Sequence, residues 1–242
     1  MRKDGRKFNE LRPVELTVDF VKFAEGSVLV SWGDTKVLCN ASVEQRVPPH
    51  VKPGHGWVTA EYAMLPRANR QRSRRDIDKL KLASRSAEIQ RLIGRSLRAA
   101  VDLSALGEYT VTVDCDVLQG DGGTRTASVT GGFVALYLAC ERLVKEGYLG
   151  ASPIRHFVAG VSAGIVDDAA LLDLPYEEDS RAQVDFNCVM NEQGDLIEIQ
   201  GTGEGRAFPA AEQQELVALC AKGIRELIAL QKETIRKAGV SV

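Results

Sequence analysis

Apolar and polar residues alternate over residues 14–20, a period-two pattern that predicts a β-strand with one buried face. The alternation continues over residues 26–44, where Trp32-Gly33-Asp34-Thr35 interrupts it with a turn signal. We therefore expect a hairpin of strands Ser27–Trp32 and Lys36–Val43, followed by a short strand around Trp57–Ala63. A run of strands that precedes any helical pattern favours an antiparallel or mixed sheet over a doubly wound parallel one.

Helical periodicity first appears over about Ser84–Ala100, where apolar residues recur every three to four positions. A strand with clean alternation, Tyr109–Leu118, follows, and it leads to a mostly apolar helix of about Ala127–Lys145. The first half of the chain thus consists of strands followed by helices.

The second half repeats this order after Gly150 and Pro153. Its strands are expected at Phe157–Val166, Ala170–Leu174, Gln183–Met190 and Leu196–Gln200. A long helix closes the chain, with Pro209 in its first turn and Gly239 just past its end. We predict an α+β fold in two layers, with mixed sheets that carry helices on one side. The chain is expected to form one domain over residues 1–242, with halves of about 1–150 and 151–242.

Composition narrows the class of protein. The 242 residues are 44% hydrophobic and carry a net charge of −2, so any basic surface that binds nucleic acid must be local. Five widely spaced cysteines argue against a disulfide framework or a zinc site. The polar N-terminus lacks the apolar region of a signal peptide, and no apolar run approaches the about 20 residues of a membrane span. We expect a cytoplasmic protein with no membrane partner.

A glycine-rich turn between a strand and a helix, within residues 117–133, is the strongest candidate for chemistry. Gly120, Gly122 and Gly123 can adopt positive φ angles and leave backbone N–H groups accessible, and a helix N-terminus behind them favours anions. Arg125 adds a guanidinium that suits phosphate oxygens, and the hydroxyls of Thr124, Thr126 and Ser128 lie close by. The pattern predicts a phosphate site, although a tight connection that merely caps the helix has the same composition.

An arginine-rich segment precedes the first helix. Its eight basic residues face only two acidic ones, Asp76 and Asp78, in a chain that is otherwise slightly acidic. They are Arg67, Arg70, Arg72, Arg74, Arg75, Lys79, Lys81 and Arg85. Such a segment is typical of loops that bind an RNA backbone by charge, and the alternative is a solvated loop without a ligand.

Carboxylates in the second half form a third candidate site. Asp185 and Glu198 are expected on one polar sheet face if their strands pair through the turn at Gly194, with Asp179 at its entrance. Converging carboxylates suit a hard divalent ion such as Mg²⁺. The ordinary wet face of an antiparallel sheet would give the same pattern.

Six blocks of the chain, in this order and spacing, resemble the ribonuclease PH family of phosphate-dependent bacterial exoribonucleases. They include DCDVLQGDGGTRTASVTG and IEIQGTGE. The blocks lie at residues 25–44, 56–68, 88–103, 114–131, 177–180 and 197–204. The resemblance implies a ribosomal-protein-S5-domain-2-like fold and a homohexamer built as a trimer of dimers.

The resemblance also implies an activity. It predicts trimming of precursor transfer RNA at the 3′ end, with inorganic phosphate as co-substrate and Mg²⁺ as cofactor, and no DNA substrate. It assigns phosphate binding to Arg85, Gly123, Thr124 and Arg125, catalysis and metal binding to Asp179 and Asp185, and transfer-RNA binding to the loop Arg67–Arg75. Two other interpretations stay open: a ring subunit that only binds RNA, and a metal-dependent hydrolytic nuclease.

Overall fold

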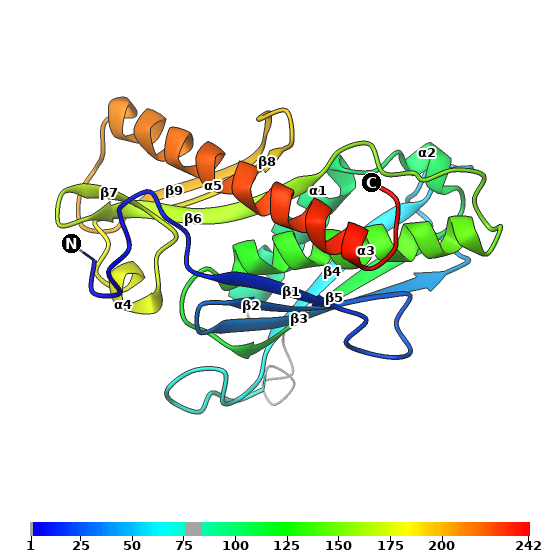
Figure 1. Ribbon diagram of the computed structural model, residues 1–242, viewed down its shortest axis with the longest axis horizontal. Helices are drawn as coiled ribbons and strands as arrows, with labels where there is room; N and C mark the ends of the chain where they lie inside the picture. The colour runs from blue at the N-terminus through cyan, green and yellow to red at the C-terminus, as the bar shows by residue number, and fades with distance from the viewer. Residues whose placement is uncertain (1, 76–83) are drawn as a thin grey trace.

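A computed structural model describes residues 2–75 and 84–242. In this part of the chain the first half forms a five-stranded sheet, in the order β1-β2-β3-β5-β4. Only β4 and β5 pair in parallel; the other neighbours are antiparallel, so the sheet is mixed, as predicted. The strands are β1 (Val14–Val18), β2 (Gly26–Trp32), β3 (Thr35–Glu44), β4 (Trp57–Met64) and β5 (Thr110–Gln119) (Figure 1).

The second half forms an antiparallel sheet of four described strands, in the order β7-β6-β8-β9. Its central strand β6 is buried along its whole length. The strands are β6 (Val158–Val166), β7 (Ala169–Leu172), β8 (Val184–Asn191) and β9 (Leu196–Gly203). The predicted α+β class with two sheets is confirmed.

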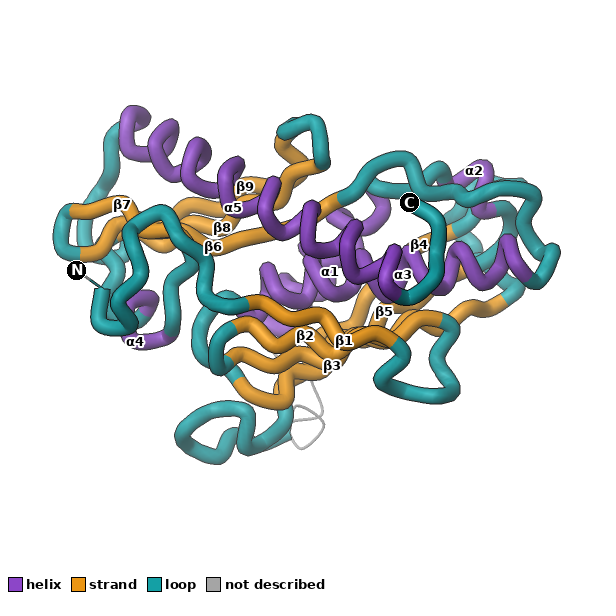
Figure 2. Tube along the Cα trace, in the orientation of Figure 1, coloured by secondary structure: helices purple, strands orange, loops and turns teal. Residues whose placement is uncertain are grey.

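Three long helices and two helices of one turn complete the described structure. They are α1 (Ser84–Ala99), α2 (Leu103–Leu106), α3 (Thr124–Lys145), α4 (Tyr176–Asp179) and α5 (Ala210–Lys237) (Figure 2). The helix α3 packs on β2 and β3 of the first sheet and also on β6 of the second, while α5 packs on β6 and β7. One continuous apolar core therefore passes through both halves. The boundary near residue 150 stays a prediction.

The central helix α3 corrects one expectation about apolar runs. By length and composition alone it could cross a membrane, but 78% of its most apolar window is buried inside the protein. Its burial follows from its position between the sheets, where apolar side chains are needed on nearly every side. The five cysteines are also buried and unpaired.

The element boundaries differ from the expectations at a few places. The helix α3 begins at Thr124 rather than Ala127, so Thr124 and Arg125 belong to its first turn. The strand β7 ends at Leu172, and α2 and α4 were not expected because a single turn is too short to show helical periodicity. In α2, the side chain of Asp102 accepts hydrogen bonds from the first backbone N–H groups and so caps the turn.

A buried cluster of charges joins the N-terminal segment to the second half. The Asp173 carboxylate, 1% exposed, accepts hydrogen bonds from the Arg12 guanidinium at 2.7 Å, from the Arg12 backbone N–H at 2.7 Å and from the Trp32 indole at 2.9 Å. The Arg2 guanidinium donates to the backbone oxygen of Asp173 at 2.7 Å and to both oxygens of Glu178, at 3.0 and 2.6 Å. Burial raises the pKa of Asp173, but Arg12 and these donors outweigh burial and lower it below its usual value.

We predict that Asp173→Asn lowers the free energy of unfolding by about 3–5 kcal/mol, because the buried Arg12 guanidinium loses its nearer carboxylate and keeps only Asp121, at 3.6 Å. Urea denaturation measures the change. Asp167→Asn is the matched control: both aspartates have positive φ angles, 56° and 51°, which asparagine tolerates, but the Asp167 side chain is 75% exposed in its ion pair with Arg181. The control should lose less than about 1 kcal/mol. Equal losses in the two variants would contradict the assignment of Asp173 as a structural centre.

Candidate active site

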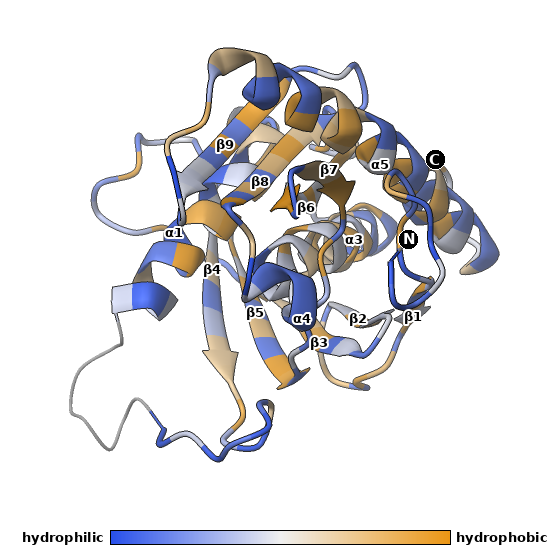
Figure 3. Ribbon diagram, turned by 90° about the vertical axis from the view of Figure 1, so that its left-hand side faces the viewer, coloured by the Kyte–Doolittle hydropathy of each residue, from blue (hydrophilic) through white to orange (hydrophobic). Residues whose placement is uncertain are grey.

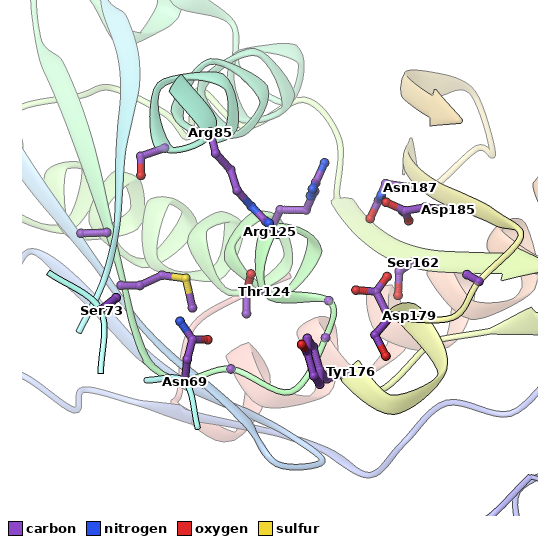
Figure 4. Close-up of a pocket in the computed structure, with 18 of the residues that line it drawn as sticks. Asn69, Ser73, Arg85, Thr124, Arg125, Ser162, Tyr176, Asp179, Asp185 and Asn187 are labelled. Atoms are coloured by element: carbon purple, nitrogen blue, oxygen red, sulfur yellow. Dashed lines mark hydrogen bonds between the residues drawn. The ribbon is translucent and has the colours of Figure 1, made fainter. Parts of the chain in front are cut away.

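A cavity of about 890 Å³ opens between the two halves of the chain. Its walls come from the loop after β4, the start of α1, the glycine-rich turn, α4 and β8 (Figure 4). Six residues predicted from the sequence lie on these walls: Arg85, Gly123, Thr124, Arg125, Asp179 and Asp185. The fold thus brings together side chains that are up to 100 residues apart in the chain.

The glycine-rich turn forms one wall because two of its residues have left-handed backbone conformations. Gly122 has a φ of +76° and Gly123, the N-cap of α3, has a φ of +66°. Gly120 lines the cavity without a positive φ, contrary to expectation. A Cβ atom on Gly122 would lie 2.4 Å from the backbone oxygen of Leu174, so glycine is required there for a second reason. The turn therefore packs directly against the segment that leads into α4.

Of the three hydroxyls expected near the turn, only that of Thr124 lines the cavity. It forms a 2.8 Å hydrogen bond with the Tyr62 hydroxyl. The other two donate to backbone oxygens of their own helical turn, Thr126 to Gly123 at 3.0 Å and Ser128 to Thr124 at 2.8 Å. Because α3 begins three residues earlier than expected, these two side chains are buried inside the fold.

Two residues that the sequence did not single out hold the turn in place. The Thr35 hydroxyl donates to the backbone oxygen of Gly122 at 2.8 Å and accepts from the backbone N–H of Asp121 at 2.9 Å. The Arg12 guanidinium donates to the backbone oxygen of Asp121 at 2.5 Å, while its other nitrogens contact Asp173. The buried charge cluster is thus connected to the glycine-rich turn. Arg12 and Thr35 lie far from the glycine-rich turn in the chain, and Thr35 was expected only in the hairpin turn after Trp32, so neither carries a sequence signal for this role.

Two guanidinium groups occupy the α1 and α3 side of the cavity. Figure 4 shows the Arg85 and Arg125 side chains near one another, with Asp179 and Asp185 on the opposite side. The Arg125 guanidinium donates to the Gln200 side-chain oxygen at 2.9 Å, which orients it. An anion bound between the glycine-rich turn and these arginines would meet backbone N–H groups and two positive charges.

The two aspartates on the opposite wall have altered acid–base properties. Burial raises the pKa of Asp179, and the nearby Asp185 raises it further, while Arg125 and Arg85 oppose the shift. Burial likewise raises the pKa of Asp185, with Arg125 lowering it and Glu204 raising it. The Asn187 amide donates to Asp185 at 3.1 Å. Two half-buried carboxylates with raised pKa values on one wall of the cavity offer a favourable place for a cation.

Asp185 and Glu198 lie on one face of the paired strands β8 and β9, as expected, but their carboxylates do not converge. In the β8–β9 register, Asp185 lies opposite Thr202, whereas Glu198 lies opposite Val189. Glu198 therefore lies farther along the sheet, where it forms a 2.9 Å ion pair with Arg95 of α1. The carboxylate just past the end of β9 that does line the cavity is Glu204. Alternation along a strand identifies which residues share a face, but it does not fix the register between two strands.

The donors on this wall suit Mg²⁺. Asp179, Asp185 and Asn187 present oxygen ligands, which hard divalent cations prefer. Among residues 2–75 and 84–242, no cluster of three or more histidine, cysteine or acidic side chains is placed to hold a metal ion. A site with two carboxylates fits an ion that keeps several waters and binds substrate phosphates, as Mg²⁺ does.

The arginine-rich loop reaches the cavity with part of its length. Arg74 and Arg75 lie on the cavity wall, whereas Arg67, Arg70 and Arg72 are exposed on the same loop outside it. In Figure 3 this loop and α4 are coloured as hydrophilic. Lys79, Lys81 and the segment up to residue 83 lie outside the described residues. The described arginines thus line an approach to the cavity, and their binding to RNA stays a prediction.

Comparison with known proteins agrees with this architecture. Two models of the 3′ exoribonuclease family match the chain, domain 1 over residues 10–140 and domain 2 over residues 156–223. The exosome of Archaeoglobus fulgidus with RNA bound to the active site has a TM-score of 0.78 and 27% identity, covering 93% of this chain and 91% of that one. An archaeal exosome core has a TM-score of 0.77 and 26% identity, covering 96% and 91%.

A plant protein shares the fold alone. The structure of rice (Oryza sativa) Rrp46 has a TM-score of 0.79 but only 17% identity, over 97% of this chain and all of that one. Together the matches cover both sheets and the cavity between them. The recognition of a ribonuclease PH-like chain from its sequence is confirmed.

We predict that Asp185→Asn raises the melting temperature at neutral pH in the absence of Mg²⁺. The pKa of Asp185 is higher in the folded state than in the unfolded state, so between these two pKa values the folded state binds more protons. The free energy of unfolding therefore falls as the pH rises from the unfolded-state pKa through the folded-state pKa. The asparagine variant lacks this fall, so its melting temperature should exceed that of wild type at neutral pH. The difference should vanish near pH 4, close to the usual pKa of aspartate. Calorimetry across pH measures the effect, with the exposed Asp34→Asn as control. A variant less stable than wild type at pH 7 would show that the charge is stabilised in the fold.

Proposed function

The chain belongs to the 3′ exoribonuclease family, and from this premise we propose that it is a phosphorolytic 3′–5′ exoribonuclease that trims precursor transfer RNA. One observation carries the proposal. A glycine-rich turn with two arginines, suited to a free anion, faces two carboxylates suited to a cation, within one cavity. A hydrolytic nuclease would need a water site where this cavity has an anion site.

In this mechanism inorganic phosphate is the nucleophile. It is already anionic at neutral pH, so it requires positioning more than activation. The backbone N–H groups behind Gly123, the Thr124 hydroxyl and the guanidinium groups of Arg85 and Arg125 hold it against the last phosphodiester. Its oxygen attacks the phosphorus, and the bond to the 3′ oxygen of the preceding nucleotide breaks.

The products are a nucleoside 5′-diphosphate and an RNA one nucleotide shorter with a free 3′ hydroxyl. Asp179 and Asp185 would hold Mg²⁺, which supplies charge neutralisation for the transferred phosphoryl group when bound. Arg125 faces both the anion site and these carboxylates, so it screens the negative charges from each other. Because a phosphodiester is exchanged for a phosphoanhydride, the reaction runs in reverse when diphosphates are abundant.

The partners in the proposal are RNA and further copies of the chain. The described arginines between Arg67 and Arg75 receive the RNA backbone at the cavity mouth, and the similar Archaeoglobus fulgidus exosome has RNA bound to its active site. Assembly as a homohexamer follows the expectation from the resemblance, and the similarity to an exosome core supports a ring. The cytoplasm, where transfer RNA precursors are available, is the proposed location.

The test is a product analysis with a short RNA, with and without inorganic phosphate. We expect nucleoside diphosphates that depend on phosphate. Arg125→Ala should reduce their formation by at least about a hundredfold, because it removes a charged donor from the anion site, while Arg91→Ala, an exposed arginine farther along α1, should retain activity. Monophosphates would indicate a hydrolytic nuclease, and no product would indicate a subunit that only binds RNA.

A second prediction concerns the arginine-rich loop. Replacing its four central arginines by alanine should weaken transfer-RNA binding and flatten its salt dependence, because each phosphate that an arginine neutralises on single-stranded RNA adds about 0.7 to the slope of log K against log salt. These residues are Arg70, Arg72, Arg74 and Arg75. Alanine at four exposed basic residues outside the loop, Lys145, Arg225, Arg236 and Lys237, controls for the same change in net charge. An unchanged slope would mean that the loop does not bind phosphates.

A further inference from the structure

One aromatic side chain lines the cavity among the residues that the structure describes. Tyr176 is the first residue of α4, and it is 51% exposed although its neighbours in the helix are engaged in ion pairs. Glu177 pairs with Lys3, and Glu178 is buried against Arg2. A large ring that remains half exposed at a cavity wall is available to a ligand.

The position of Tyr176 relative to Asp179 is fixed by the short helix. Three residues apart on one helical turn, the two side chains leave the same side, with about 5–6 Å between Cβ atoms. Figure 4 shows both extending from α4 at the cavity. A nucleotide whose 5′ phosphate lies at Asp179 and Asp185 therefore has its base within reach of the ring.

The support beneath Tyr176 is rigid. The backbone oxygen of Tyr176 accepts a hydrogen bond from the Ser180 backbone N–H at 2.9 Å, and the Arg2–Glu178 pair anchors the middle of the helix. On the other side, Gly122 packs so closely that any side chain there would contact the backbone nitrogen of Tyr176. The ring is thus presented at a defined place next to the anion site, as a binding surface requires.

A positive charge lies over the same ring. The Arg70 guanidinium carbon is 6.0 Å from the Tyr176 ring centroid, at the outer limit of a cation–π contact. Arg70 comes from the arginine-rich loop of the first half, so the loop and α4 meet at the cavity mouth. An aromatic face with a guanidinium beside it is the combination on which single-stranded RNA bases stack.

We propose that Tyr176 forms a stacking site for the nucleobase of the 3′-terminal nucleotide, with Arg70 beside the base. The inference rests on the proposed function, since it takes the 3′ end of RNA as the ligand. Every base has a π face, so the site grips the terminal nucleotide without selecting its sequence. A processing enzyme that meets many different 3′ ends requires such tolerance.

The experiment compares two short RNAs that differ only at the 3′-terminal nucleotide, one with its base and one with an abasic ribose. Binding is titrated with the full chain and Mg²⁺ but without phosphate, so that no phosphorolysis occurs. Wild type should bind the intact RNA about tenfold more tightly than the abasic RNA. In Tyr176→Ala the ratio should fall to about one, whereas Tyr176→Phe, which keeps the ring, should retain the wild-type ratio.

The comparison of intact with abasic RNA distinguishes a stacking role of Tyr176 from a purely structural one. If Tyr176 merely packs against Arg70 to hold the loop, alanine weakens binding of both RNAs equally, and the proposal is overturned. A wild type that does not distinguish the two RNAs overturns it as well. Tyr148→Ala, which removes a similarly exposed tyrosine outside the cavity, should keep the wild-type ratio.

Failure of the proposed function has a different signature. Wild type would then release no diphosphates with phosphate present, yet the difference between intact and abasic RNA would persist and depend on Tyr176. That result would leave the stacking site in place on an RNA-binding subunit. If wild type releases diphosphates but binds intact and abasic RNA equally well, the stacking site is overturned and the proposed function stands.

Discussion

The buried carboxylate of Asp173 is the interaction on which the geometry of the cavity depends. Through Arg12 it reaches the backbone of the glycine-rich turn, and its backbone oxygen accepts from Arg2, which holds Glu178 in α4. The two walls of the cavity come from different halves of the chain, so their spacing is set by this cluster and by the close approach of Gly122 to Leu174. Isolated buried charges are costly, and the cluster is stable only because each carboxylate and guanidinium has several partners.

The buried Asp173 and the two half-buried aspartates of the cavity have pKa values that are shifted in opposite directions. Asp173 is surrounded by donors and has a lowered pKa, so its charge stabilises the folded state at neutral pH. Asp179 and Asp185 line the cavity and have raised pKa values, so their charges oppose folding there. Groups that carry an unfavourable charge in an accessible cavity are typical of functional sites, where a ligand supplies the missing partner. The stability given by the first aspartate allows the fold to tolerate the other two.

The sequence predicted most of the fold because its strands alternate cleanly and its long helices have apolar stripes. It also identified residues on both cavity walls, since a glycine-rich turn with Arg125 and a polar strand face with Asp185 are local patterns. The sequence did not predict the features that depend on contacts between residues far apart in the chain. Tertiary packing leaves no periodic signal in the chain. It determines the register that separates Glu198 from Asp185 and the hydrogen bonds by which Arg12 and Thr35 hold the turn. It also determines the one-turn helix α4 that carries Tyr176.

The closeness of the two walls bears on the choice between phosphate and water as nucleophile. A cation held by Asp179 and Asp185 would serve either nucleophile, because it neutralises charge on the phosphoryl group and also lowers the pKa of a bound water. Phosphate needs no base, only an anion site within bonding distance of the scissile phosphorus. The absence of a side chain at Gly122 lets the turn approach the segment leading into α4 closely enough to provide that arrangement. A larger residue would separate the anion site from the carboxylates, and the cavity would then bind phosphate and RNA without bringing them together.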